Sequence, residues 1–147
     1  MTVYFDSSAF VAVYVTEAYS ARARQELRRH GRVPWTPLHD LEVRNGLRLL
    51  RGRKHIDETE LHGLLAHVDD DLQRGRLARP VIDLGAAFRR AEELSRKHAS
   101  KTLARTLDVL HVAALIEIGC ETLVSGDERQ ISLARAEGLR TLDIRAT

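Results

Sequence analysis

Short apolar segments alternate with longer helical segments along this chain, and that alternation constrains its fold more than any other feature. Strand character occurs at residues 2–5, 32–35, 77–83, 121–125 and 140–144. Helical character occurs at residues 9–15, 18–30, 37–51, 57–75, 84–100, 105–119 and 128–137. Because helices separate the strands, the strands should run parallel with helices on both faces of the sheet. We predict an α/β fold, a three-layer sandwich formed by residues 1–147 as one domain.

The composition restricts the kinds of site and the cellular location that we expect for this chain. The single Cys120 excludes an internal disulfide and any zinc site built from several cysteines. No apolar run is long enough to cross a bilayer, so we expect a cytoplasmic protein without membrane contact. The formal net charge is +2, and most of the cations are arginine. Arginine binds phosphate with two parallel donors, although these arginines could also be solvated helix faces.

The first strand ends in an acid. Residues 2–5 have strand preference, Asp6 follows directly, and Ser7 and Ser8 lead into a helix. An acid in this place lies at the carboxyl edge of the sheet, where α/β proteins bind ligands. The alternative is that Asp6 only caps the helix that follows it. Asp127 is placed in the same way, just after the strand that ends at Ser125.

Two further acids interrupt apolar helix faces. Glu42 shares a helical row with Leu38, Asn45 and Leu49, where an uncompensated charge is costly. Asp108 lies in the most apolar helix of the chain, with His111 one turn later on the same side. The alternatives are that Asp108 is a first-turn acid that interacts with the helix dipole and that His111 is a hydrogen-bonded core histidine.

Four such acids in one small domain suggest a shared site formed by Asp6, Glu42, Asp108 and Asp127. Carboxylates that are packed together repel one another, and a hard divalent cation with oxygen ligands relieves this repulsion. Mg²⁺ or Mn²⁺ suits such ligands and commonly serves phosphodiester hydrolysis. An acidic metal pocket surrounded by arginine fits a nucleic-acid substrate.

The chain resembles PIN-domain ribonucleases, specifically the VapC-type toxins of bacterial toxin–antitoxin pairs. The residues that carry this resemblance are Asp6-Ser7-Ser8-Ala9, Leu41-Glu42-Val43-Arg44-Asn45 and the segments 106–114, 124–130 and 133–139. The resemblance covers the whole chain and is most specific in its last forty or so residues.

The resemblance implies a parallel sheet of strand order 3-2-1-4-5 and cleavage of single-stranded or loop RNA with Mg²⁺ or Mn²⁺. Asp6 and Asp108 would be the principal metal ligands, and Glu42 and Asp127 would complete the pocket directly or through water. The residues that would support these acids are Ser7, Asn45 and Ser125. A cognate VapB-like antitoxin and a homodimer are also implied, with the helix at residues 57–75 as a candidate clamp.

Two other functions compete with this interpretation. Haloacid-dehalogenase-like phosphatases also have Asp after the first strand, but they need a second Asp two residues later, where this chain has Ser8. A catalytically silent PIN-like module that binds RNA or protein is the alternative from a different functional class.

Overall fold

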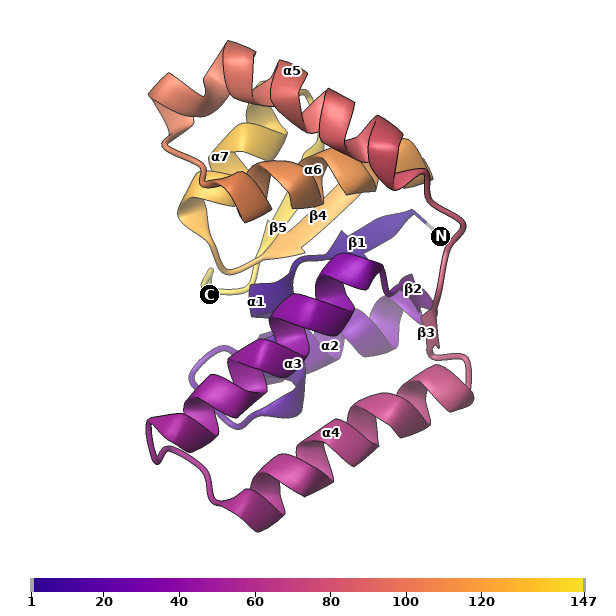
Figure 1. The fold of residues 1–147 in the computed structure, drawn as a ribbon, viewed down its shortest axis with the longest axis vertical. Coiled ribbons are helices and arrows are strands. Elements are labelled where there is room, and N and C mark those ends of the chain that lie inside the picture. Colours follow the sequence, from indigo (N-terminus) through magenta and orange to yellow (C-terminus); the bar gives the residue numbers. More distant parts are fainter. Residues whose placement is uncertain (1, 147) are drawn as a thin grey trace.

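The computed structural model describes residues 2–146 as an α/β fold (Figure 1). The elements are, in order, β1 (Val3–Phe5), α1 (Ser7–Tyr14), α2 (Ser20–His30), β2 (Val33–Pro34), α3 (Pro37–Gly52), α4 (Glu58–Gln73), β3 (Leu77–Ala78), α5 (Leu84–Thr102), α6 (Thr106–Ile118), β4 (Thr122–Ser125), α7 (Glu128–Ala136) and β5 (Arg140–Asp143). The predicted alternation of strands and helices is confirmed. The predicted strand at 77–83 is wrong in length, since β3 contains only two residues.

All strand pairs are parallel, as predicted, but they form two ladders. One has the order β1-β4-β5, with Tyr4 opposite Leu123 and Leu123 opposite Thr141. The other pairs β2 with β3 alone. The predicted continuous order 3-2-1-4-5 is therefore wrong in one respect, because the ladder is interrupted between β1 and β2, although these strands lie side by side (Figure 1).

Proline and histidine explain the interruption. The N–H groups of Val33 and Trp35 donate towards the β3 segment, to the carbonyls of Arg76 and Ala78. The next donor that β2 could turn towards β1 would come from Pro34, which has no N–H. On the other side, the carbonyl of Phe5 is bonded to Nε2 of His39 at 2.7 Å.

The sheet separates two apolar clusters, which confirms helices on both faces. Phe5 and Val124 pack on the side of α1 to α4, with Phe10 and Trp35 fully buried there. On the opposite side, Tyr4 and the other inward residues of that face pack against α5, α6 and α7. Residues Val109–Leu115 of α6 are all buried, as the apolar sequence of this helix predicts.

Capping side chains close in the sequence fix the residues at which several helices begin. Asp57 and Glu60 form the predicted capping box of α4, in which each side chain accepts from the other residue's backbone N–H. Asp83 caps α5 by accepting from the N–H of Ala86 at 2.9 Å. Among the helices within residues 2–146, none has the length and hydropathy that a membrane span requires.

Candidate active site

Asp6 lies at the carboxyl edge of β1 and is 1% exposed. One of its carboxylate oxygens accepts from the Ser8 hydroxyl at 2.7 Å and from the N–H of Ala9 at 2.8 Å. The other accepts from the Ser125 hydroxyl at 2.5 Å. Burial raises the pKa of Asp6, and these hydrogen bonds oppose the rise only in part. Asp6 thus caps α1 and also connects β1 to the end of β4.

Ser125 continues this connection towards the other acids. Its hydroxyl oxygen accepts from the N–H of Asp127 at 2.8 Å. Asp127 caps α7, with Oδ1 accepting from the N–H groups of Arg129 and Gln130 at 2.9 and 3.1 Å. Ser125 therefore joins Asp6 to Asp127, the two acids that the sequence places at strand ends.

Gln130 links Asp127 to Asp108. Its side-chain Nε2 donates to Oδ1 of Asp108 at 3.2 Å, while its backbone N–H is bonded to Asp127. The other oxygen of Asp108 accepts from the N–H of Arg105 at 3.0 Å and so caps α6. Gln130 is 2% exposed, and its Oε1 is buried without a hydrogen-bond partner among the described residues.

Glu42 reaches the site from α3. Its Oε1 is bonded to Nε2 of His111 at 2.7 Å, and the Ser7 hydroxyl donates to it as well. Burial alone would raise the pKa of Glu42, but the hydrogen bonds from His111 and Ser7 outweigh it and hold the pKa below its usual value. Asn45, the remaining predicted residue, is exposed, and within residues 2–146 no hydrogen bond joins it to these acids.

The acids are connected but do not form a closed cluster. Within residues 2–146, no three His, Cys, Asp or Glu side chains are gathered so that they could hold a metal ion. Mg²⁺ commonly keeps several waters and binds through one or two carboxylates. Asp6, Asp127 and Asp108 provide carboxylate oxygens in one hydrogen-bonded network, and the buried Oε1 of Gln130 beside Asp108 is an acceptor without a partner among the described residues. The residues present therefore fit a hydrated hard cation.

Four residues of this network were not among the predicted site residues: Ser8, His111, Gln130 and Tyr4. Gln130 lies three positions after Asp127, in the first turn of α7, where its side chain can face a neighbouring helix. Its polarity is the only sequence signal for a place in this network. Tyr4 donates towards His111 from within an apolar strand, with its hydroxyl 2.6 Å from Nδ1. The sequence pattern of β1 contains nothing that distinguishes this hydroxyl from a core ring.

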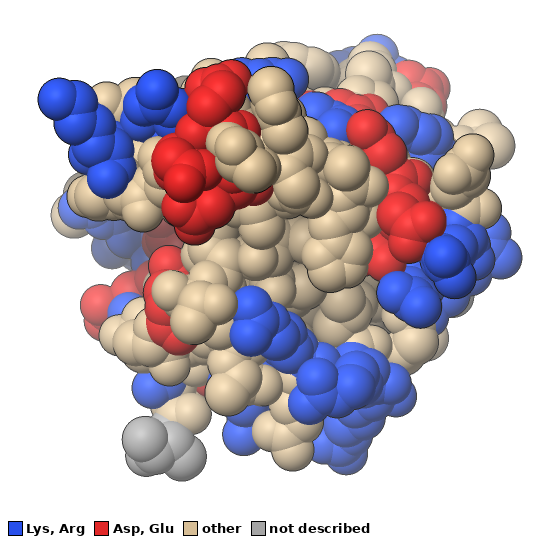
Figure 2. Space-filling model, turned by 90° about the horizontal axis from the view of Figure 1, so that it is seen from below, with Lys and Arg blue, Asp and Glu red and all other residues tan. Residues whose placement is uncertain are grey.

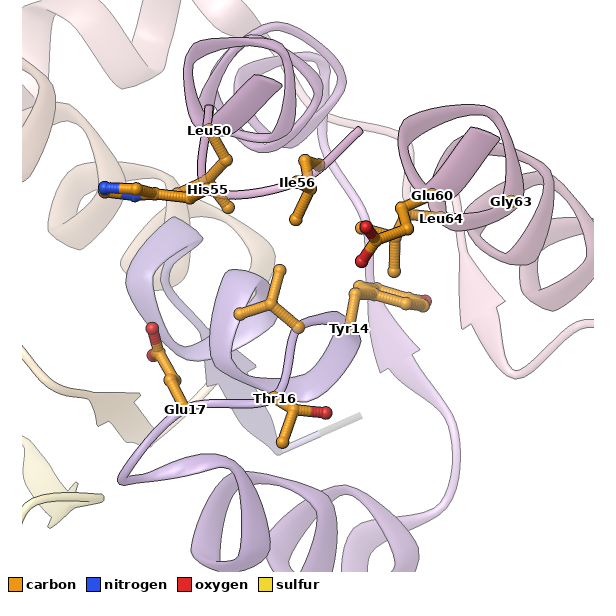
Figure 3. Close-up of a pocket in the computed structure, with 10 residues that line it drawn as sticks. Tyr14, Thr16, Glu17, Leu50, His55, Ile56, Glu60, Gly63 and Leu64 are labelled. Atoms are coloured by element: carbon orange, nitrogen blue, oxygen red, sulfur yellow. The ribbon is translucent and has the colours of Figure 1, made fainter. Parts of the chain in front are cut away.

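Arginine borders the acid site. A cavity of about 290 Å³ beside Asp127 is lined also by Arg105 and Arg129. The larger cavities lie elsewhere. One of about 690 Å³ is lined by five arginines: Arg24 and Arg28 of α2, Arg32 just before β2, and Arg74 and Arg76 just after α4. Another of about 550 Å³ lies between α1, α3 and α4 (Figure 3). Figure 2 shows acidic and basic side chains in separate groups around an uncharged central area.

Comparison with known proteins completes this description. The sequence family described as PIN domain matches residues 3–136. The crystal structure of FitAcB from Neisseria gonorrhoeae has the same fold, with a TM-score of 0.68 and 12% sequence identity over 99% of each chain. No match was found among curated proteins.

Proposed function

Because this chain belongs to the PIN-domain family, we propose that it is a metal-dependent endoribonuclease that acts as the toxin of a VapBC-type pair. One observation carries the proposal: three acids from three different elements are connected at one sheet edge through Ser125 and Gln130. The connected acids are Asp6, Asp108 and Asp127. The carboxyl edge of a parallel sheet is where α/β proteins bind their ligands.

Each acid has a proposed role. Asp6 and Asp108 would hold Mg²⁺ or Mn²⁺, and Glu42 and Asp127 would act on ion-bound water. When bound, such an ion activates a water and neutralises charge on the phosphate. Ser7 and Ser125 donate to Glu42 and Asp6 and so orient their carboxylates. Asn45 lies one turn after Glu42 on α3, where it would contact the RNA or a bound water.

The surroundings support an RNA substrate. Arg105 and Arg129 line the cavity beside Asp127, and guanidinium groups hold phosphate with paired donors. A single strand or a loop fits such an open edge better than a duplex does, because its backbone can bend into the pocket. Base selection would depend on the shape of this edge.

A cognate VapB-like antitoxin and a second copy of this chain are the proposed partners. The cavity between α1, α3 and α4 is lined in part by the apolar side chains of Leu50, Ile56 and Leu64, which suit an antitoxin segment (Figure 3), with α4 as the clamp. For a homodimer, the support is a set of exposed large apolar side chains on α3, α5 and α6. Its members are Leu41, Phe88 and Leu107.

One observation favours the alternative of a silent binding module. Asp6, Asp108 and Asp127 each cap a helix, so each has a structural role that needs no metal. A module of this kind would bind RNA or a partner protein without cleaving it.

An RNA cleavage assay with a matched pair of variants distinguishes the endoribonuclease from the silent binding module. Wild-type protein should cut a single-stranded RNA in Mg²⁺ or Mn²⁺ and stop on addition of EDTA. Asp6→Asn should lower the cleavage rate at least about 100-fold, because a direct ligand is lost. Asp83→Asn alters a helix-capping aspartate of the same kind outside the site and should cleave as wild type does.

Equal cleavage by wild type and Asp6→Asn would refute the assignment of Asp6. RNA binding by the wild type without metal-dependent cleavage would favour the silent module. Mapping cut sites in total cellular RNA after brief induction, with Asp6→Asn as control, would identify the target.

A further inference from the structure

A buried hydrogen-bond chain leads from the core of the protein to Glu42. The Tyr4 hydroxyl lies 2.6 Å from Nδ1 of His111, and Nε2 of His111 lies 2.7 Å from Oε1 of Glu42. The three residues come from β1, α6 and α3, and the bonded pairs are 107 and 69 positions apart in the sequence. These hydrogen bonds therefore connect β1 to the acid site through tertiary contacts alone.

The partners set the direction of the protons. The Glu42 carboxylate can only accept, so Nε2 of His111 carries a proton and donates it. The Tyr4 hydroxyl is fully buried and lies 2.6 Å from Nδ1, so its O–H is directed at that nitrogen and donates to it. Thr36 in turn bonds to the Tyr4 hydroxyl. Nε2 of His111 also lies 3.1 Å from the Ser7 hydroxyl oxygen, which can accept from it while the Ser7 hydroxyl donates to Glu42. No donor in this network faces another donor.

Burial makes this hydrogen-bond chain rigid. Tyr4 is fully buried and His111 is 1% exposed, whereas the Glu42 side chain is 32% exposed. A glutamate on a helix surface has three side-chain torsions and loses much rotamer freedom when it is held in one place. His111 is locked by packing and by bonds at both ring nitrogens, so it can hold the exposed carboxylate in one orientation.

We infer that Tyr4 and His111 are positioning residues that hold the Glu42 carboxylate at the acid site. This inference rests on the proposed function, because it assumes that Glu42 acts there. Neither residue touches the substrate in this arrangement, and both act through Glu42. Groups that orient acting side chains in this way typically change activity 10–100-fold when they are removed.

The protein contains matched control residues for Tyr4 and His111. Tyr14 has a buried hydroxyl that donates to Asp71 at 2.7 Å, away from the acids. His39 is as buried as His111, with the two ring centroids 5.1 Å apart. Its ring nitrogens are bonded to the carbonyl of Phe5 and to Thr36, and to none of the acids.

The experiment compares kinetics within each pair. Tyr4→Phe should lower kcat about 10–100-fold with KM for the RNA within about twofold of wild type. Tyr14→Phe should leave kcat unchanged at a temperature where both variants are folded. His111→Gln keeps an amide donor and should retain more activity than His111→Leu, whereas His39→Gln should keep the wild-type kcat. The inference is overturned if Tyr4→Phe matches Tyr14→Phe or if His39→Gln loses as much activity as His111→Gln.

A second measurement does not depend on turnover. In protein labelled with ¹⁵N-histidine, long-range ¹H–¹⁵N spectra should show the Nε2–H form of His111 and a marked shift of that nitrogen in Glu42→Gln. The His39 signals should stay unchanged in Glu42→Gln. A wild type that binds RNA but never cleaves it refutes the proposed function, while an unshifted His111 nitrogen refutes the positioning chain.

Discussion

The Ser125 hydroxyl donates a hydrogen bond of 2.5 Å to Asp6 across 119 residues of sequence. The bond joins the carboxyl ends of β1 and β4, which are neighbours in the parallel sheet. Asp6 accepts three hydrogen bonds in total, yet burial still raises its pKa. An ionised carboxylate in this place costs stability, as is typical of side chains that are kept for function.

Replacing Asp6 should stabilise the protein. The folded-state pKa of Asp6 lies above the unfolded value, so ionisation destabilises the fold as pH rises through and above the usual aspartate range near about pH 4. An asparagine avoids this cost and still accepts from the N–H of Ala9. We expect Asp6→Asn to raise the free energy of unfolding at pH 7 by about 0.5–2 kcal/mol, and the gain should shrink below about pH 4.

Urea denaturation at a series of pH values measures this gain. Asp83→Asn, an exposed capping aspartate, should show no comparable gain at pH 7. If Asp6→Asn is less stable than wild type at pH 7, the carboxylate is needed for folding and the trade-off between stability and function is absent.

Gln130 should affect metal binding more than stability. Gln130→Met keeps the size of the side chain but removes the donor to Asp108 and the unpartnered Oε1. Because outer contacts of ligands tune metal affinity, we expect Mn²⁺ affinity to fall about 10–100-fold. Titration followed by electron paramagnetic resonance measures the affinity, and Gln73→Met at an exposed position of α4 is the control. Unchanged affinity in Gln130→Met would show that Asp108 does not need this amide.

Local sequence signals predicted most helices well, because their causes are local. The Asp57 and Glu60 capping box, and the apolar run of α6, lie within one or a few turns and form as expected. Asp6 and Asp127 were placed at strand ends because the strand–acid–helix pattern is itself local. Each of these two acids caps a helix just after a strand end, and their role in a ligand site stays a prediction.

Features that depend on distant partners were not predictable in the same way. The gap between β1 and β2 arises because Pro34 lacks an N–H and His39 bonds the Phe5 carbonyl. His111 was noted only as a polar exception in α6, since its partners Tyr4 and Glu42 lie far along the chain. Helical periodicity shows which face a residue occupies but does not show which atom it meets across the core.

Asp40 should stabilise the protein at neutral pH and lose this effect in acid. Burial raises the pKa of Asp40, but hydrogen bonds from Arg79, Trp35 and Arg44 outweigh burial and lower it. A lowered folded-state pKa gives stability that is present above the unfolded value, near about pH 4, and is lost as pH falls through the folded one. The melting temperature of Asp40→Asn should therefore be below that of wild type at pH 7, and the two should converge below about pH 4.

Thermal melts at several pH values test this prediction. Asp69→Asn is the matched control, because Asp69 bonds the same Arg44 at 2.9 Å but has a side chain that is 65% exposed. Its melting temperature should change little, as is usual for exposed ion pairs. A difference between Asp40→Asn and wild type that stays constant with pH would mean that the carboxylate charge is not responsible.

Tyr14 should hold α1 against α4 through its hydroxyl. The hydroxyl donates to Asp71 at 2.7 Å, and both side chains are buried where the two helices meet. Tyr14→Phe leaves Asp71 with the Arg76 bond at 3.0 Å but removes its tyrosine donor. Hydrogen bonds to charged groups contribute about 1.5–3 kcal/mol, so the free energy of unfolding should fall by about that amount.

The pH dependence adds a second test of the same bond. Burial, together with the neighbouring Asp71, raises the pKa of Tyr14 above its usual value. The neutral phenol is then favoured by folding, and its contribution should decline as pH rises above the usual tyrosine value of about 10. Wild type should lose stability above about pH 10 more steeply than Tyr14→Phe does. Tyr19→Phe, at a residue that is 41% exposed, should behave as wild type. Parallel curves for wild type and Tyr14→Phe would show that this phenol has the same pKa in the folded and unfolded chain.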